Sequence, residues 1–160
     1  MHRRKWSFLF LVVAAVLLLG ACSSGPVRRV SEPSASIQQL TVAADGSWSV
    51  DLRLQNYSSI PMRFDAIDLA VTLGDQPAGT LQGNAGISIG PESADVVTLA
   101  HAPTSAARIA IADALSANQG IGYALEGTLQ VVPDGSGTRR FDIKRTSSLN
   151  PVPGLPGVLR

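Results

Sequence analysis

The strongest constraint on the fold comes from residues 47–56, SWSVDLRLQN, in which apolar and polar side chains alternate. Successive side chains of an extended strand point to opposite faces, so alternation places one set in a core and the other in solvent. The segment therefore predicts a half-buried antiparallel strand. Its inward set is Trp48, Val50, Leu52 and Leu54, and its outward set is Ser49, Asp51, Arg53 and Gln55.

The same period of two recurs along most of the chain, with turn signals such as GDQP and PDGSG between the segments. The parity changes between Phe64 and Ile67, and a β-bulge near Asp65 and Ala66 reconciles the two halves of that segment. The pattern predicts a mainly β protein, an antiparallel sandwich of about seven strands. The expected strands are residues 36–42, 47–56, 62–73, 78–83, 94–102, 121–132 and 138–146.

One segment breaks this rhythm. Residues 104–120 are rich in alanine and contain neither glycine nor proline before Gly120. Thr104 or Ser105 can cap the start, and Asn118 with the glycine can end it. We expect one α-helix in a connection, packed on a sheet through a face that collects Ala107, Ile111, Ala114 and Leu115.

The N-terminus is typical of a secretory signal peptide, because a basic stretch precedes the apolar run Phe8–Leu19. The run is shorter than the 20 or so residues that span a bilayer, although an uncleaved anchor stays an alternative. LGAC, residues 19–22, resembles the lipobox of bacterial lipoproteins. The resemblance implies a signal peptide at 1–21, cleavage between Ala21 and Cys22, and acylation of Cys22. The alternative is a chance cysteine in an ordinary signal peptide.

The lipobox resemblance also implies a place in the cell. Ser23 after the cysteine, rather than aspartate, implies the periplasmic face of the outer membrane. Residues 22–35 are rich in serine and proline and predict a lipidated flexible tether, and 153–160 predict an extended tail. Arg28 and Arg29 either touch anionic lipid head groups or are solvated charges in a linker.

The mature chain would keep 139 residues, with ten basic and twelve acidic side chains. A net charge of about −2 gives no basic field for nucleic acid. Cys22 is the single cysteine, so its acylation would leave no thiol for a disulfide, a thiolate metal site or a nucleophile. The expected partner is therefore the membrane, through the N-terminal lipid, with an envelope protein or lipid as a further candidate.

No residue pattern argues for catalysis. His101 is the one histidine of the mature chain and has no ligand cluster beside it, whereas a metal site needs three or four ligands. Asp65 and Asp68 are expected to meet solvent at the bulge. Trp48 and Tyr123 lie on apolar strand faces and are expected in the core. We therefore expect no enzyme, no metal and no cofactor.

Several stretches resemble the LEA type 2 family (late embryogenesis abundant, with the water stress and hypersensitive response or WHy domain). They are LRLQNYSSIPMRF, LAVTLGDQPAGT, ISIGPESADVVTL, YALEGTLQV and FDIKRTSSLNPV. Asn56, Pro61 and Gly127 occupy matching places, while Tyr57 and Ser148 depart from residues common there. The resemblance implies an immunoglobulin-like or fibronectin III-like sandwich over residues 36–152, without catalytic residues, and a role in desiccation tolerance.

The three matching residues have structural reasons to be where they are. Asn56 can bond its own turn backbone and tolerate a left-handed conformation. Pro61 presets the backbone at the turn exit. Gly127 indicates a bulge, or close packing by the helix.

Two functions follow from the sequence. The first is a lipid-anchored, non-catalytic envelope protein of desiccation and water-stress tolerance. The alternative is an envelope lipoprotein that docks a protein or lipid partner through a sandwich face or an edge strand.

Overall fold

The computed structural model describes residues 27–160, which form eight strands and one helix. The signal peptide, the Ala21–Cys22 cleavage position and Cys22 lie outside the described residues. The elements are β1 (Ser34–Val42), β2 (Trp48–Gln55), β3 (Met62–Leu73), β4 (Gln76–Ile89), β5 (Ala94–His101), α2 (Ser105–Ser116), β6 (Ile121–Pro133), β7 (Arg139–Leu149) and β8 (Val158–Leu159).

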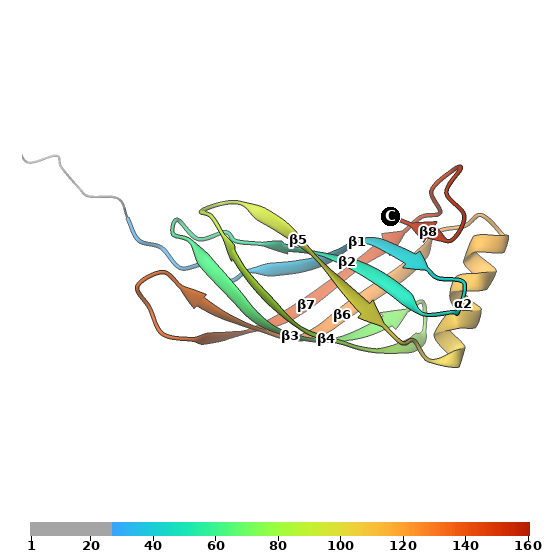
Figure 1. Cartoon of the computed structure of the whole chain (residues 1–160), viewed down its shortest axis with the longest axis horizontal. Helices are drawn as coiled ribbons and strands as arrows, with labels where there is room; N and C mark the ends of the chain where they lie inside the picture. The colour runs from blue at the N-terminus through green and yellow to red at the C-terminus, as the bar shows by residue number, and fades with distance from the viewer. Residues whose placement is uncertain (1–26) are drawn as a thin grey trace, which may run out of the picture.

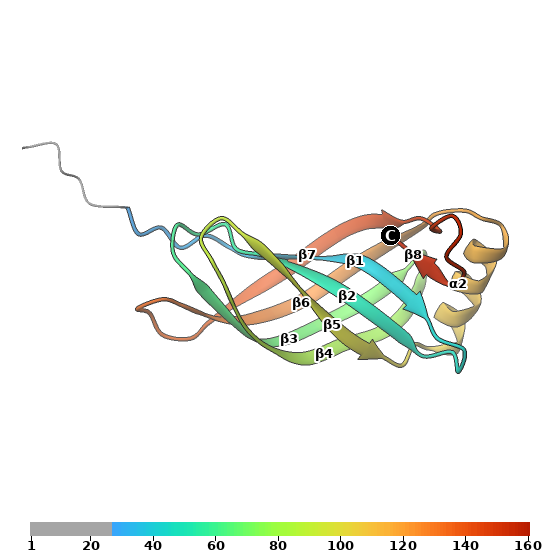
Figure 2. The ribbon, with the colours of Figure 1, turned by 45° about the horizontal axis from the view of Figure 1, so that its top comes forward.

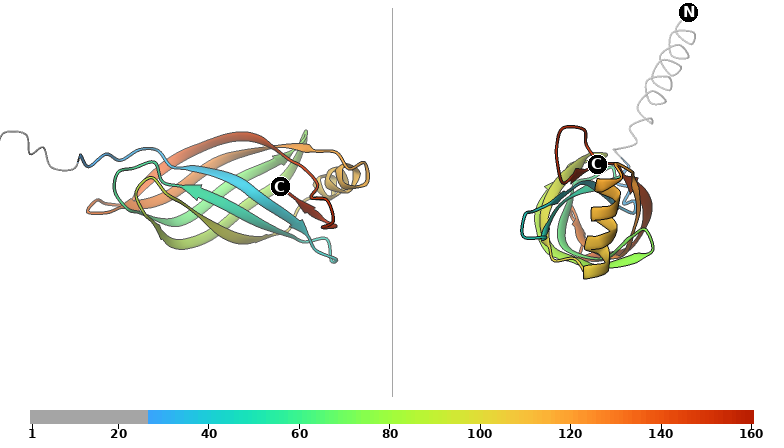
Figure 3. Two further views of the ribbon diagram at one scale, coloured as in Figure 1. Left: turned by 90° about the horizontal axis from the view of Figure 1, so that it is seen from above. Right: turned by 90° about the vertical axis from the view of Figure 1, so that its right-hand side faces the viewer.

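Two four-stranded antiparallel sheets face each other. Sheet A has the order β5-β2-β1-β8, and sheet B has the order β4-β3-β6-β7. The strands run along the long axis of an elongated domain, and α2 lies across one end (Figures 1 and 3). This arrangement confirms the predicted mainly β antiparallel sandwich with one helix in a connection.

The core lies between the two sheets, and the alternation in the sequence supplies it from both sides. Trp48 and Tyr123 are buried, as predicted. The backbone N–H of Ile37 in β1 donates to the Tyr123 hydroxyl in β6 across 3.1 Å, which ties the two sheets together. The largest fully buried side chains are Leu40, Leu52, Leu54, Met62, Phe64, Leu69, Leu73, Leu81, Ile111, Leu125, Leu129 and Leu149.

The bulge in β3 is confirmed, because the register of β3 shifts between Phe64 and Ala66 against both of its neighbours. β4 differs from the expectation: it spans 14 residues and continues through the glycine-rich stretch that follows residue 83. Its glycines give room to β5, since a Cβ at Gly83 would lie 2.6 Å from the Leu99 side chain. Glycine in β4 therefore reflects close packing of the two edge strands.

The C-terminal tail is folded back rather than simply extended. Val158 and Leu159 form β8, which pairs with Thr41 and Leu40 at the edge of β1. Leu159 is fully buried, and its pairing supplies the eighth strand that the sequence pattern did not predict. β1 also begins at Ser34, two residues before the expected domain boundary.

The predicted helix is confirmed, with Thr104 as its N-cap, but it ends at Ser116 and lies across the end of the sandwich rather than on the face of a sheet. The Thr104 hydroxyl accepts a hydrogen bond from the Ala107 N–H at 3.2 Å. Ala107 and Ile111 are buried against the ends of β3 and β4, and Leu115 is half-buried. Within residues 27–160, no helix combines the length and apolar character needed to cross a bilayer.

Glycine is required at position 127 in β6 because the backbone of β3 lies too close for a side chain. A Cβ at this position would overlap the carbonyl oxygen of Asp68 in β3 and lie 3.0 Å from the Leu69 Cα. The expected packing by the helix is therefore wrong, because the neighbour is the adjacent strand. The φ of +156° is also one that side-chain-bearing residues rarely adopt.

We predict that Gly127→Ala lowers the free energy of unfolding by about 1–3 kcal/mol, because the new methyl group forces β3 and β6 apart. Urea denaturation followed by circular dichroism measures this change. Gly137→Ala is the matched control, since a Cβ there meets nothing within 4 Å. Equal denaturation midpoints for the two variants would contradict the requirement for glycine at 127.

Candidate functional site

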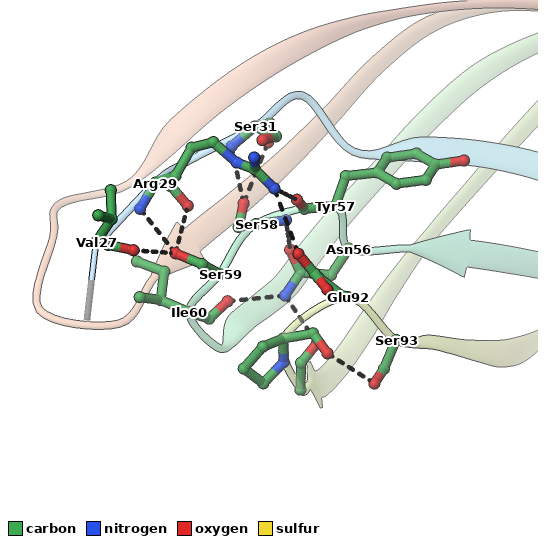
Figure 4. Close-up of polar contacts among 12 residues, drawn as sticks. Val27, Arg29, Ser31, Asn56, Tyr57, Ser58, Ser59, Ile60, Glu92 and Ser93 are labelled. Carbon is green, nitrogen blue, oxygen red and sulfur yellow. Dashed lines mark hydrogen bonds and ion pairs between the residues drawn. The ribbon is translucent and has the colours of Figure 1, made fainter.

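The most highly connected polar cluster lies at the end of the sandwich where the described chain begins (Figure 4). Residues 27–31 are hydrogen-bonded there to the loop 56–61. The Arg29 side chain also reaches Glu92 in the β4–β5 turn, residues 90–93. We call this cluster the docking junction. It lies opposite α2, at the far end of the long axis (Figure 2).

Asn56 is the centre of the docking junction and is completely buried. Its Oδ1 accepts from the Ser58 N–H at 2.8 Å, which closes the turn. Its Nδ2 donates toward the carbonyl oxygens of Ile60, Ile89 and Gly90, at 2.9, 3.1 and 2.9 Å. The side chain therefore joins its own loop to the end of β4.

The backbone at Asn56 is not left-handed, contrary to the expectation. The non-glycine residues with positive φ in the described range are Glu92 and Asn118. Asn56 acts here through its side-chain amide, which both donates and accepts hydrogen bonds, and not through a left-handed backbone.

Two serines that follow Asn56 hold the N-terminal segment. The Ser59 hydroxyl donates to the Val27 carbonyl at 2.6 Å and accepts from the Arg29 N–H at 2.8 Å. The Ser59 N–H donates to the Arg29 carbonyl at 3.0 Å. The buried Ser58 hydroxyl accepts from the Ser31 N–H at 2.9 Å. The backbone atoms of residues 27–31 are thus held by hydrogen bonds from Ser58 and Ser59 before β1 begins.

Arg28 and Arg29 point to acidic loops of the domain itself. Arg28 donates to the Asp134 carbonyl at 2.6 Å, and its guanidinium lies 3.5 Å from the Asp134 carboxylate. Arg29 lies 3.4 Å from the Glu92 carboxylate and donates to the Tyr57 carbonyl. These groups are more than half exposed, so each pair contributes little energy, but together they orient the segment.

Pro61 joins the docking junction to the rest of sheet B. It stands immediately before β3 and is exposed, so its fixed φ sets the direction in which the strand leaves the loop. Its carbonyl accepts from the Asp134 N–H at 2.9 Å, which ties the β6–β7 turn to the same end of the domain.

Nothing in the described range assembles a reactive group. His101 is buried, its Nε2 lies 2.7 Å from the Ala78 carbonyl oxygen, and its ring packs on Trp48 with centroids 5.8 Å apart. Asp65 pairs with Arg63 at 2.8 Å. Residues 27–160 contain no cluster of three or more histidine, cysteine or acidic residues that could hold a metal ion.

One carboxyl has a shifted pKa, and it lies far from the docking junction. Hydrogen bonds from the Ser47 hydroxyl and the Ser47 N–H to Asp45 lower the pKa of that carboxyl. Asp45 lies in the exposed β1–β2 turn, so the shift reflects turn geometry. The contacts of the docking junction therefore serve to position residues 27–31 against the domain.

We predict that Asn56→Asp lowers the free energy of unfolding by about 3 kcal/mol or more at pH 7, because a buried carboxylate would face three carbonyl oxygens. These neighbours raise the pKa of the new carboxyl above its unfolded value of about 4. The loss is therefore smallest below pH 4 and grows as the pH rises through that value.

Urea denaturation between pH 4 and 7 measures this dependence. Asn84→Asp makes the same chemical change at an exposed position of β4 and serves as the control. Parallel pH profiles for the two variants would show that the amide of Asn56 has no special role.

The fold is similar to those of solved proteins. A solution structure from Arabidopsis thaliana aligns with a TM-score of 0.52 and 12% identity, over 81% of this chain and 87% of that chain. A crystal structure from Archaeoglobus fulgidus aligns with a TM-score of 0.45 and 12% identity, over 78% and 98%. A comparison with curated protein sequences finds no match.

The family is settled by a sequence profile. The profile described as late embryogenesis abundant protein, LEA_2, matches residues 51–147, which is more than half of the chain. This range includes Asn56, Pro61 and Gly127. The match confirms the resemblance seen in the sequence, and members of this family are generally non-enzymatic. The chain therefore belongs to the late embryogenesis abundant family, type 2.

Proposed function

We propose that this protein is a lipid-anchored, non-catalytic LEA type 2 protein of the cell envelope that protects the cell during desiccation and water stress. Membership of the family supports a stress-related role. The LGAC sequence supports acylation of Cys22, and Ser23 supports the periplasmic face of the outer membrane. One observation carries the proposal: a chain whose residues 51–147 match the profile of a stress-related family also has a lipobox-like LGAC at residues 19–22.

A folded surface, rather than a disordered chain, provides the protection. The sequence is 45% hydrophobic and 16% charged, values typical of a packed domain. The outward face of sheet B offers uncharged polar side chains, whose amide and hydroxyl groups hydrogen-bond to water or to neighbouring surfaces. The exposed members of this set are Thr80, Gln82, Asn84, Thr146 and Ser148.

We predict that the mature protein begins at Cys22 with added acyl mass, and that Cys22→Ser abolishes both the acylation and the cleavage before residue 22, which leaves the full-length precursor. Intact mass after envelope fractionation measures this. A deletion strain should survive drying poorly, with survival restored by the wild-type chain and not by the Cys22 variant. Unchanged survival would contradict the stress role, whereas a soluble, unmodified product would contradict the anchor.

A second candidate is an envelope lipoprotein that binds a protein or lipid partner through an edge strand. The observation that favours it is β7, which pairs with β6 alone within residues 27–160 and is largely exposed. The backbone N–H and C=O groups on its outer edge can pair with another strand, although its basic side chains discourage non-specific pairing. Those residues are Arg139, Arg140, Lys144 and Arg145.

We predict, if this second function holds, that a photo-crosslinker in place of Arg145 captures one dominant envelope partner. A crosslinker in place of Asp51, on the outward face of sheet A, is the control. Recovery of the same abundant neighbours from both positions would exclude binding through β7.

A further inference from the structure

The docking junction limits how far the domain can stand from the membrane. A chain extends at most about 3.6 Å per residue, so the five residues from Cys22 to Val27 reach at most about 18 Å. If all of residues 22–35 were free, the thirteen steps to Ala35 would reach about 47 Å. The hydrogen bonds of residues 27–31 remove most of that freedom.

The same contacts decide which end of the domain is near the acylated residue. The loop 56–61, the turn 90–93 and the β6–β7 turn all lie at the end where residue 27 enters, and α2 lies at the other end (Figures 1 and 2). Because five residues at most separate Cys22 from the first of these contacts, and the domain is elongated, that end lies nearest the lipid and α2 lies away from it.

The side chains at the near end suit a lipid headgroup layer. Val27 is 78% exposed, and Tyr57 is 50% exposed with its ring at the surface. The Tyr57 ring points along the sandwich toward β1 and away from Val27, and its hydroxyl lies 3.5 Å from the Ser34 hydroxyl (Figure 4). Tyrosine favours the interface between water and lipid, because its ring is apolar and its hydroxyl is polar, so Tyr57 suits the border between this end and the aqueous side.

Three arginines at this end are paired with acidic side chains. Arg28 lies beside Asp134, Arg29 beside Glu92 and Arg63 beside Asp65. Arg139 and Arg140, which follow the β6–β7 turn, are exposed and belong to none of the ion pairs among residues 27–160, so they are free to meet lipid phosphates.

We propose that the docking junction holds the domain upright, with Val27 and the β6–β7 turn seated in the headgroup layer of the membrane that carries the Cys22 anchor, and with Tyr57 at the border of that layer. This inference rests on the proposed lipid anchor. It assigns the near end as the membrane-facing surface and the α2 end as the surface presented to the aqueous side.

Site-specific labels test the orientation. Acylated Cys22 leaves no free thiol, so one introduced cysteine is a unique label site. We choose Gly137→Cys, in the β6–β7 turn where an added side chain meets nothing within 4 Å, and Ile109→Cys, on α2 where the side chain is 63% exposed. The lipidated protein, labelled with an environment-sensitive fluorophore, is reconstituted in phosphatidylcholine vesicles.

We expect iodide to quench the label at position 137 several-fold less than the label at position 109. Combining Arg28→Ala, Arg29→Ala, Ser58→Ala and Ser59→Ala removes every side-chain hydrogen bond described for residues 27–31 and leaves the Ser59 N–H to Arg29 carbonyl bond. This variant should raise quenching at position 137 toward that at 109, with circular dichroism unchanged. Vesicle flotation separates the outcomes. Protein that floats with equal quenching at both positions overturns the orientation alone, and protein that fails to float overturns the anchor and the orientation with it.

Discussion

The buried amide of Asn56 is the interaction on which this end of the structure depends. Its four hydrogen bonds join the loop after β2 to the end of β4, and that loop then presents Ser58 and Ser59 to the N-terminal segment. A buried carbonyl left without a donor destabilises the fold by about 1–3 kcal/mol. Loss of the Asn56 side chain would leave three carbonyl oxygens without this donor at once. Segments more than 25 residues apart in sequence thus share one anchor point.

Closure of the sandwich relies on contacts between sheets at both of its sides. On one side the Leu99 side chain of β5 lies over Gly83 of β4, where the missing Cβ leaves room. On the other, the Tyr123 hydroxyl receives the Ile37 N–H, and β8 covers the edge of β1. Covering the edge of β1 blocks unwanted strand pairing at that edge.

Family membership and geometry bear on function in different ways. The LEA_2 match places the chain among stress-related proteins, while a shared fold at 12% identity speaks for architecture alone. The geometry adds a fixed attachment, because residues 27–31 are hydrogen-bonded to the loop 56–61. If the proposed anchor holds, protection would act through a surface oriented relative to the lipid.

The sequence by itself determined the features that depend on near neighbours in the chain. Alternation in residues 47–56 predicted β2, Thr104 and Ser105 limited the start of α2 to two positions, and the parity change predicted the bulge beside Phe64. Only the tertiary structure decided that β4 continues through its glycines, that Leu159 pairs with Leu40, and that Ser59 captures residues 27–31. Each of these contacts joins segments distant in sequence. Local periodicity carries no information about such partners, because they are chosen by the space and the unpaired hydrogen-bonding groups that the folded core leaves at its edges.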